Sequence, residues 1–94
     1  MHSPPHPGPI LAAELDERKI SISQAARDLG VSRQTISRII NEAQPITPEM
    51  AAKVGHYFGG DAGLWARMQA NHDLWNALET LAPELENIPV AAAN

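Results

Sequence analysis

Five polar side chains between residues 33 and 41 carry hydrogen-bond donors, and no carboxylate lies among them: Arg33, Gln34, Ser37, Arg38 and Asn41. At about 100° per residue, these five fall on one arc of a helix, while Ile36 and Ile39 fall on the opposite arc. Arg, Gln and Asn pair bidentately with guanine and adenine edges, and Ser can donate to a base or a phosphate. These residue types at this spacing could therefore read bases in the major groove of DNA.

A polar arc on a single helix is more often an ordinary solvent-exposed face, so the residues before it decide between the two interpretations. Two apolar stripes flank Gly30, with Ala25, Ala26 and Leu29 before it and Ile36, Ile39 and Ile40 after it. Ser23 and Ser32 stand just ahead of the stripes, where their hydroxyls are expected to cap two helices. The pattern predicts two short helices crossing at a tight turn, which is a helix-turn-helix, with the polar arc on its second helix.

The charge distribution agrees with this interpretation, although the whole chain carries a net charge of -4. Five of the seven Lys and Arg residues, and one acidic residue, lie within residues 18–38, which therefore carry +4. After Arg67 there are four acidic residues and no Lys or Arg. Because the field at a surface follows the local arrangement of charges, we expect a positive patch around residues 18–38 and a C-terminal end that points away from DNA.

Several classes of function are not expected. The chain has 94 residues and no cysteine, and its four histidines lack the spacing of zinc ligands. It contains no phosphate-binding glycine loop and no nucleophile with a paired base, so we expect neither catalysis nor a metal or other cofactor. It also lacks an apolar run long enough for a membrane span and the pattern of a signal peptide, which predicts a soluble cytoplasmic protein.

The chain is expected to form an all-α fold of five helices between two flexible ends. Residues 1–8 are predicted to be a flexible arm, 9–81 the folded domain and 82–94 a flexible tail. Thr47 and Asp61 are expected to cap the fourth and fifth helices, and Pro83 to end the fifth. Gly55 lies inside a predicted helix, so another part of the chain is expected to approach it closely. The helices are predicted over residues 9–19, 23–29, 32–41, 48–58 and 62–81.

The fifth predicted helix carries a seam of side chains that could pack against another helix. Leu64, Met68, Asn71, Trp75 and Leu78 follow a 4-3-4-3 spacing. One possibility is that the whole seam folds back on the domain's own core, which we expect for Trp65. By Trp75, however, the helix has run about 20 Å, beyond a body of four short helices. We therefore predict a homodimer interface around Met68, Asn71, His72, Trp75 and Leu78. A two-fold dimer would hold two reading helices about one turn apart on palindromic DNA.

The order of motifs resembles that of the HigA (VapI-type) antitoxins, a branch of the phage-repressor-like (Xre-type) helix-turn-helix family. The shared motifs are HPGPIL, SQAARDLGVSRQTISRIIN, PITPEMA and LWARMQANHDLW, from His6 to Trp75. The resemblance implies an α-helical dimer that represses its own operon and neutralises a RelE-like endoribonuclease toxin encoded beside it. It also implies base contacts from Arg33, Gln34 and Arg38, and phosphate contacts from Gln24, Ser32, Thr35 and Ser37. We keep Ser37 among the base-reading candidates and take as phosphate candidates Ser23, Gln24, Ser32 and Thr35.

Two departures from the family pattern lie outside the reading helix. Pro9 stands where an acidic residue usually follows HPG, and Asp61-Ala62-Gly63 replaces the usual Ser-Pro-Glu before Trp65. Two alternatives to an antitoxin remain: a stand-alone transcriptional regulator without a toxin, and an interaction module that has lost DNA binding. The intact polar arc argues against the second. A small basic protein encoded next to this chain would distinguish an antitoxin from a stand-alone regulator.

Overall fold

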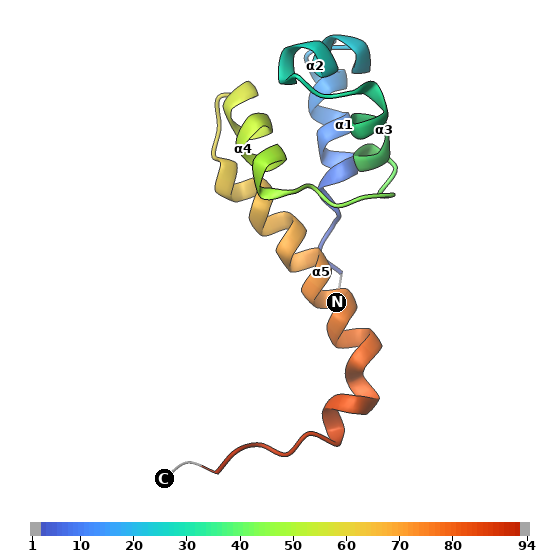
Figure 1. Cartoon of the computed structure of the whole chain (residues 1–94), viewed down its shortest axis with the longest axis vertical. Helices are drawn as coiled ribbons and strands as arrows, with labels where there is room; N and C mark the ends of the chain where they lie inside the picture. Colours follow the sequence, from blue (N-terminus) through green and yellow to red (C-terminus); the bar gives the residue numbers. More distant parts are fainter. Residues whose placement is uncertain (1–2, 93–94) are drawn as a thin grey trace.

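Five α-helices and no β-strand make up residues 3–92, the part of the chain that the computed structural model describes. The helices are α1 (Pro7–Glu17), α2 (Ile22–Leu29), α3 (Arg33–Ile40), α4 (Pro48–Tyr57) and α5 (Ala62–Glu86). The first four form one body, and α5 begins beside α4 and runs out of that body toward the C-terminus (Figure 1). The molecule therefore measures 54 Å along its long axis but only 26 and 24 Å across it. The predicted all-α, five-helix fold is confirmed.

The turn between α2 and α3 follows the sequence prediction closely. Gly30 ends α2 in the left-handed conformation, with φ of 69°, and its N–H donates to the carbonyls of Ala26 and Arg27. Ser32 caps α3 by accepting a hydrogen bond from the Thr35 N–H at 3.0 Å. The predicted cap of α2 was wrong, because Ser21 accepts from the Gln24 N–H and the helix begins at Ile22. Ser23 lies inside the first turn instead.

The first helix begins two residues earlier than predicted, at Pro7 rather than Pro9. His6 caps it, since its Nδ1 accepts a hydrogen bond from the Gly8 N–H at 2.9 Å. Both prolines fit the first turn, where a backbone N–H has no partner inside the helix. The helix ends at Glu17 rather than Lys19, because Lys19 takes the left-handed conformation. Residues 1 and 2 of the predicted arm lie outside the described part of the chain.

The fourth helix matches its prediction to within one residue. Thr47 accepts from the Met50 N–H at 3.2 Å, Pro48 takes the first position, and Phe58 is the C-cap after Tyr57. Its buried side chains join those of the other helices in one core. That core consists of Leu11, Leu15, Ala25, Ala26, Leu29, Ile36, Ile39, Ile46, Met50, Ala51, Val54 and Trp65.

The fifth helix continues past the proline that was expected to end it. Its last residue is Glu86, and Pro83 lies inside the helix. A proline removes its own N–H bond to the preceding turn, and its ring crowds the carbonyl four residues back. Neither effect prevents the residues after the proline from forming another turn, so a solvent-exposed helix can continue past it. The predicted boundary at Leu81 was therefore five residues short. Residues 93 and 94 lie outside the described part of the chain.

Another segment does approach Gly55 closely, as predicted, and it is the start of α5. A methyl group at this position would lie 2.6 Å from the backbone N and Cα of Ala62. Such an overlap costs about 1–3 kcal/mol, which exceeds the gain of up to about 1 kcal/mol from better helix propensity. We expect Gly55→Ala to lower the free energy of unfolding by about 1–2 kcal/mol in urea titrations.

Gly60 offers a matched control for this substitution. A Cβ added there meets no atom of residues 3–92 within 4 Å, and the φ of Gly60 is not positive. Gly60→Ala should leave the unfolding midpoint nearly unchanged. Equal midpoints for the Gly55→Ala variant and the unmodified chain would contradict the close packing of α4 on α5.

Candidate nucleic-acid interface

The outward side of α3 carries the five side chains predicted to read bases. Arg33, Gln34, Arg38 and Asn41 are exposed and Ser37 is half-buried, whereas Ile36 and Ile39 are buried on the opposite side. We call this set the reading face: Arg33, Gln34, Ser37, Arg38 and Asn41. It lies uncovered in the single chain, which is the condition that a base-reading role requires. Its contacts with bases stay a prediction.

The reading face is held by rigid packing behind it. The first turn of α1 presses on the end of α3 so closely that a methyl group on Gly8 would lie 2.0 Å from the Ile39 carbonyl oxygen. The side chains of Ile36 and Ile39 are at most 1 % exposed. A helix fixed on its inner side by such packing presents its outer side chains in a defined orientation.

The two arginines of the reading face are free of acidic partners. Within residues 3–92, the ion pairs are Arg18 with Glu14 and Arg67 with Asp61, so neither Arg33 nor Arg38 is neutralised. Arg33 instead donates from Nη1 to the hydroxyl of Ser23 at 3.3 Å. Guanidinium groups without a carboxylate partner keep their donors available for phosphates and base edges.

Two of the phosphate candidates lie on α2 and two on α3 or at its N-cap, and all four side chains already form hydrogen bonds. The Ser32 hydroxyl is 2.9 Å from that of Thr35 and also caps α3. Ser23 accepts from Arg33, and Gln24 bonds to two neighbours on its own helix. The structure thus gives each candidate a local role, and phosphate binding by them stays a prediction.

A chain of hydrogen bonds along α2 was missed by sequence reasoning. Arg27 donates to the Gln24 side-chain oxygen at 2.8 Å, and the Gln24 amide nitrogen donates to Asp28 at 2.7 Å. The Tyr57 hydroxyl of α4 donates to the other oxygen of Asp28. This hydrogen bond, together with burial and the nearby negative charge, raises the pKa of Tyr57 above its ordinary value. The spacing of Gln24, Arg27 and Asp28 could have indicated the hydrogen bonds within α2. It could not indicate the bond from Tyr57, which is 29 residues from Asp28 in the sequence.

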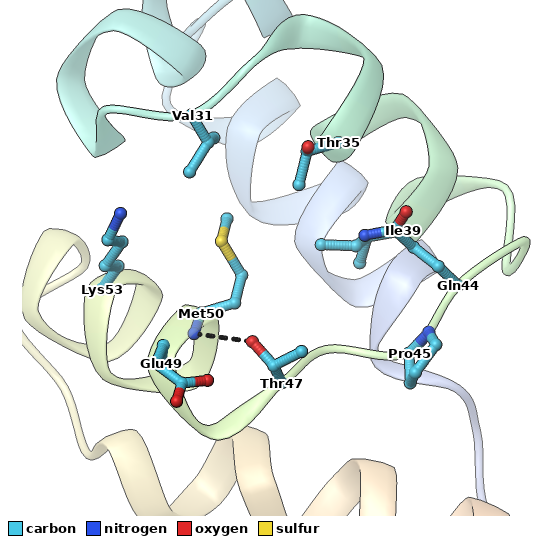
Figure 2. A pocket seen from close by; sticks show the side chains of 9 residues that line it. All are labelled: Val31, Thr35, Ile39, Gln44, Pro45, Thr47, Glu49, Met50 and Lys53. Atoms are coloured by element: carbon cyan, nitrogen blue, oxygen red, sulfur yellow. Dashed lines mark hydrogen bonds between the residues drawn. The ribbon is translucent and has the colours of Figure 1, made fainter.

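A small pocket between α3 and α4 lies beside the reading face (Figure 2). Met50 extends from α4 toward Val31, and Ile39 lines the pocket from α3. Its volume of about 210 Å³ is below the range of roughly 300–1,000 Å³ in which ligand pockets usually fall. Thr47, whose hydroxyl accepts from the Met50 N–H, is another lining residue (Figure 2). The polar surface of α3 is therefore a stronger candidate site than this pocket.

Residues 11–65 match the protein family HTH_3, described as Helix-turn-helix. The chain belongs to this helix-turn-helix family. Among its relatives is virulence-associated protein A' of Dichelobacter nodosus, 37% identical over 86 residues, which cover 90% of this chain and 75% of that protein.

Solved structures of helix-turn-helix proteins resemble this one over nearly their full length. A HigA-family addiction module antidote protein from Coxiella burnetii is 30% identical, with a TM-score of 0.87 over 97% of this chain and 100% of the other. The Pseudomonas aeruginosa antitoxin HigA, solved with the higBA promoter, is 34% identical, with a TM-score of 0.87 over 96% and 99%. The resemblance to HigA antitoxins inferred from the sequence motifs is thereby confirmed.

A second surface of this helix-turn-helix protein lies on α5, where the dimer interface was predicted. Trp65 is only 4 % exposed and belongs to the core, as expected, and Met68 packs against that core from its edge. Farther along, Asn71 is exposed, Trp75 is half-buried and Leu78 is 50 % exposed. The distal half of the helix therefore leaves apolar surface uncovered in the single chain, while its pairing with a second copy stays a prediction.

His72, the fifth residue of the predicted interface, makes contacts within its own chain. Its Nδ1 lies 3.0 Å from the carbonyl oxygen of Pro4, its Nε2 lies 3.1 Å from the Asn76 side-chain nitrogen, and its ring meets that of His6 edge-on at 5.1 Å. The N-terminal segment is therefore attached to α5.

Gln69 attaches the loop before α4 to α5. It is buried, and its side-chain oxygen accepts from the Ile46 N–H at 2.8 Å while its nitrogen donates to Asp73. These contacts give a structural reason for the Gln and Asp that follow Trp65 in the motif. Among residues 3–92, no three His, Asp or Glu side chains gather closely enough to hold a metal ion, and no helix is long and apolar enough to cross a membrane.

Proposed function

We propose that this protein is the antitoxin and autorepressor of a toxin–antitoxin pair. It binds palindromic operator DNA as a homodimer, inserts α3 of each subunit into the major groove, and occludes its own promoter. It also neutralises a RelE-like ribonuclease encoded in the same operon. The single observation that carries the DNA role is the exposed reading face, whose two arginines have no acidic partner among residues 3–92.

The comparison with the Pseudomonas protein supports this proposal. That protein is an antitoxin solved with the higBA promoter. The resemblance covers 99% of that protein and 96% of this chain, so it includes α5 as well as the helix-turn-helix. The acidic end of the chain agrees with the same orientation, since residues after Arg67 carry four acids and no Lys or Arg. Because DNA phosphates repel this acidic end, one orientation on DNA is favoured, with α3 facing the DNA and the C-terminal end pointing away from it. A repressor of this kind acts in the cytoplasm.

A titration with the DNA upstream of the protein's own reading frame tests the repressor role. We expect a retarded complex in a gel shift at concentrations at which a shuffled duplex of the same length and composition stays free. Affinity should fall steeply with added salt, because phosphate contacts release counterions. Equal affinity for both duplexes would contradict operator recognition.

Co-expression with the neighbouring open reading frame tests the antitoxin role. We expect the two proteins to copurify and this chain to restore growth that the neighbour alone arrests. Operator binding without copurification or growth rescue would identify a stand-alone regulator of the same fold.

A further inference from the structure

A notch at the junction of α2 and α3 gathers two cationic side chains beside the reading face. It is lined by Ser23, Ala26, Arg27, Val31 and Arg33. Ala26 and Val31 are its apolar residues, while two guanidinium groups and one hydroxyl provide hydrogen-bond donors. Neither arginine pairs with a carboxylate among the described residues. We call this site the phosphate notch.

The arginine of α2 is held in place by the hydrogen-bond chain that begins on α4. Tyr57 and the Gln24 amide nitrogen each donate to a separate oxygen of Asp28. With its nitrogen occupied in this way, Gln24 turns its oxygen toward Arg27, which donates one N–H to it at 2.8 Å. A guanidinium has five N–H donors, so four remain for another acceptor. This series of hydrogen bonds fixes the orientation of Arg27 without neutralising its charge.

We propose that the phosphate notch binds one phosphate group of the DNA backbone, with Arg27 as a direct contact and Tyr57 as a positioning residue that acts through Asp28 and Gln24. This inference rests on the proposed DNA-binding function. A phosphate oxygen pair matches the fork of a guanidinium, and charge-assisted hydrogen bonds of this type are stronger than neutral ones. The location also fits, since a helix lying in the major groove has backbone phosphates along both of its edges.

The same geometry explains why Arg27 carries no sequence information. A contact with phosphate positions the protein but is indifferent to the base, so its loss weakens binding to every duplex alike. Base-reading residues behave differently, because their loss weakens operator binding more than binding to other DNA. The two roles are therefore separable by measuring both duplexes.

Arg27→Gln tests the contact, with Arg67→Gln as the matched loss of one positive charge on α5. Affinity for a random-sequence duplex and for the upstream DNA is measured by fluorescence anisotropy between about 50 and 200 mM salt. We expect Arg27→Gln to weaken both complexes by a similar factor, on the order of tenfold, and to lower the salt slope by about 1 for each bound subunit. Arg67→Gln should leave the slope unchanged.

Tyr57→Phe tests the positioning role, because it removes only the hydroxyl that donates to Asp28. We expect a weaker version of the Arg27→Gln effect, with the same change in both duplexes. In the double variant, Tyr57→Phe should add nothing to Arg27→Gln, whereas a merely structural role would weaken binding equally in both backgrounds. Circular dichroism melting of each variant separates loss of fold from loss of positioning.

The outcomes separate this inference from the function on which it rests. If the unmodified protein binds DNA but Arg27→Gln keeps its affinity and salt slope, the phosphate notch is disproved and the repressor function stands. If Arg27→Gln behaves as expected but the double variant is weaker still by the full effect of Tyr57→Phe, the positioning role of Tyr57 is disproved. If the unmodified protein binds neither duplex, both the inference and the proposed function fail.

Discussion

Replacing Arg38 with alanine should cost about 1–3 kcal/mol of specific operator binding, the range for one bidentate base contact. Arg38 is exposed on α3 and has no acidic partner among residues 3–92, so its donors are available for a guanine edge. We expect a loss in the same range for Arg33→Ala, measured by gel-shift titration against the DNA upstream of the reading frame. For Arg38→Ala, discrimination between that DNA and a shuffled duplex should narrow by the same amount.

A control for this experiment comes from α5, outside the helix-turn-helix. Arg67→Ala removes a positive charge from α5 and should leave operator affinity nearly unchanged. Arg33 also lines the phosphate notch and donates to Ser23, so its variant should weaken non-specific binding as well, while Arg38→Ala should spare it. Unchanged operator affinity for both single variants would refute base reading by α3.

The helix-turn-helix could be predicted from the sequence because the residues that determine it are close together in the chain. Gly30 supplies the left-handed residue that a tight turn needs, and Ser32 lies one residue before the helix that it caps. The alternation of apolar and polar residues then fixes which side of α3 faces the core. The position of Ser21 shows the limit of this reasoning, since two serines stood near the start of α2 and the sequence did not distinguish between them.

The features that the sequence did not predict depend on contacts between residues far apart in the sequence. His6 can cap α1 because Nδ1 of a neutral imidazole accepts a hydrogen bond, and it is only 6 % exposed because the N-terminal segment lies against His72 of α5. Nothing in the local pattern of prolines around residue 7 indicates that attachment. The same holds for Gln69 and Ile46, which are 23 residues apart, and for the bond from Tyr57 to Asp28. Periodicity and caps predict helices, but they do not predict which polar side chains connect them.

The exposed apolar side chains of α5 lead to the prediction with the largest expected effect on assembly. Helix α5 runs out of the four-helix body (Figure 1) and measures about 37 Å from end to end at the usual helical rise. Trp75 and Leu78 belong to its distal half. In a dimer, packing of these side chains against a second copy would remove them from water. We expect Trp75→Glu to yield monomers in multi-angle light scattering, because a carboxylate in the middle of that seam cannot be buried without a partner.

Loss of the dimer should also weaken operator binding strongly, because each monomer then contacts one half-site alone and loses the gain from two linked contacts. Ala77→Glu is the matched control, since it adds the same charge two residues away on the opposite side of the helix, where the side chain is exposed. That variant should remain dimeric and bind the operator normally. If light scattering gives a dimeric mass for Trp75→Glu, the subunits associate through another surface. The apolar seam of α5 would then be available to bind a different protein.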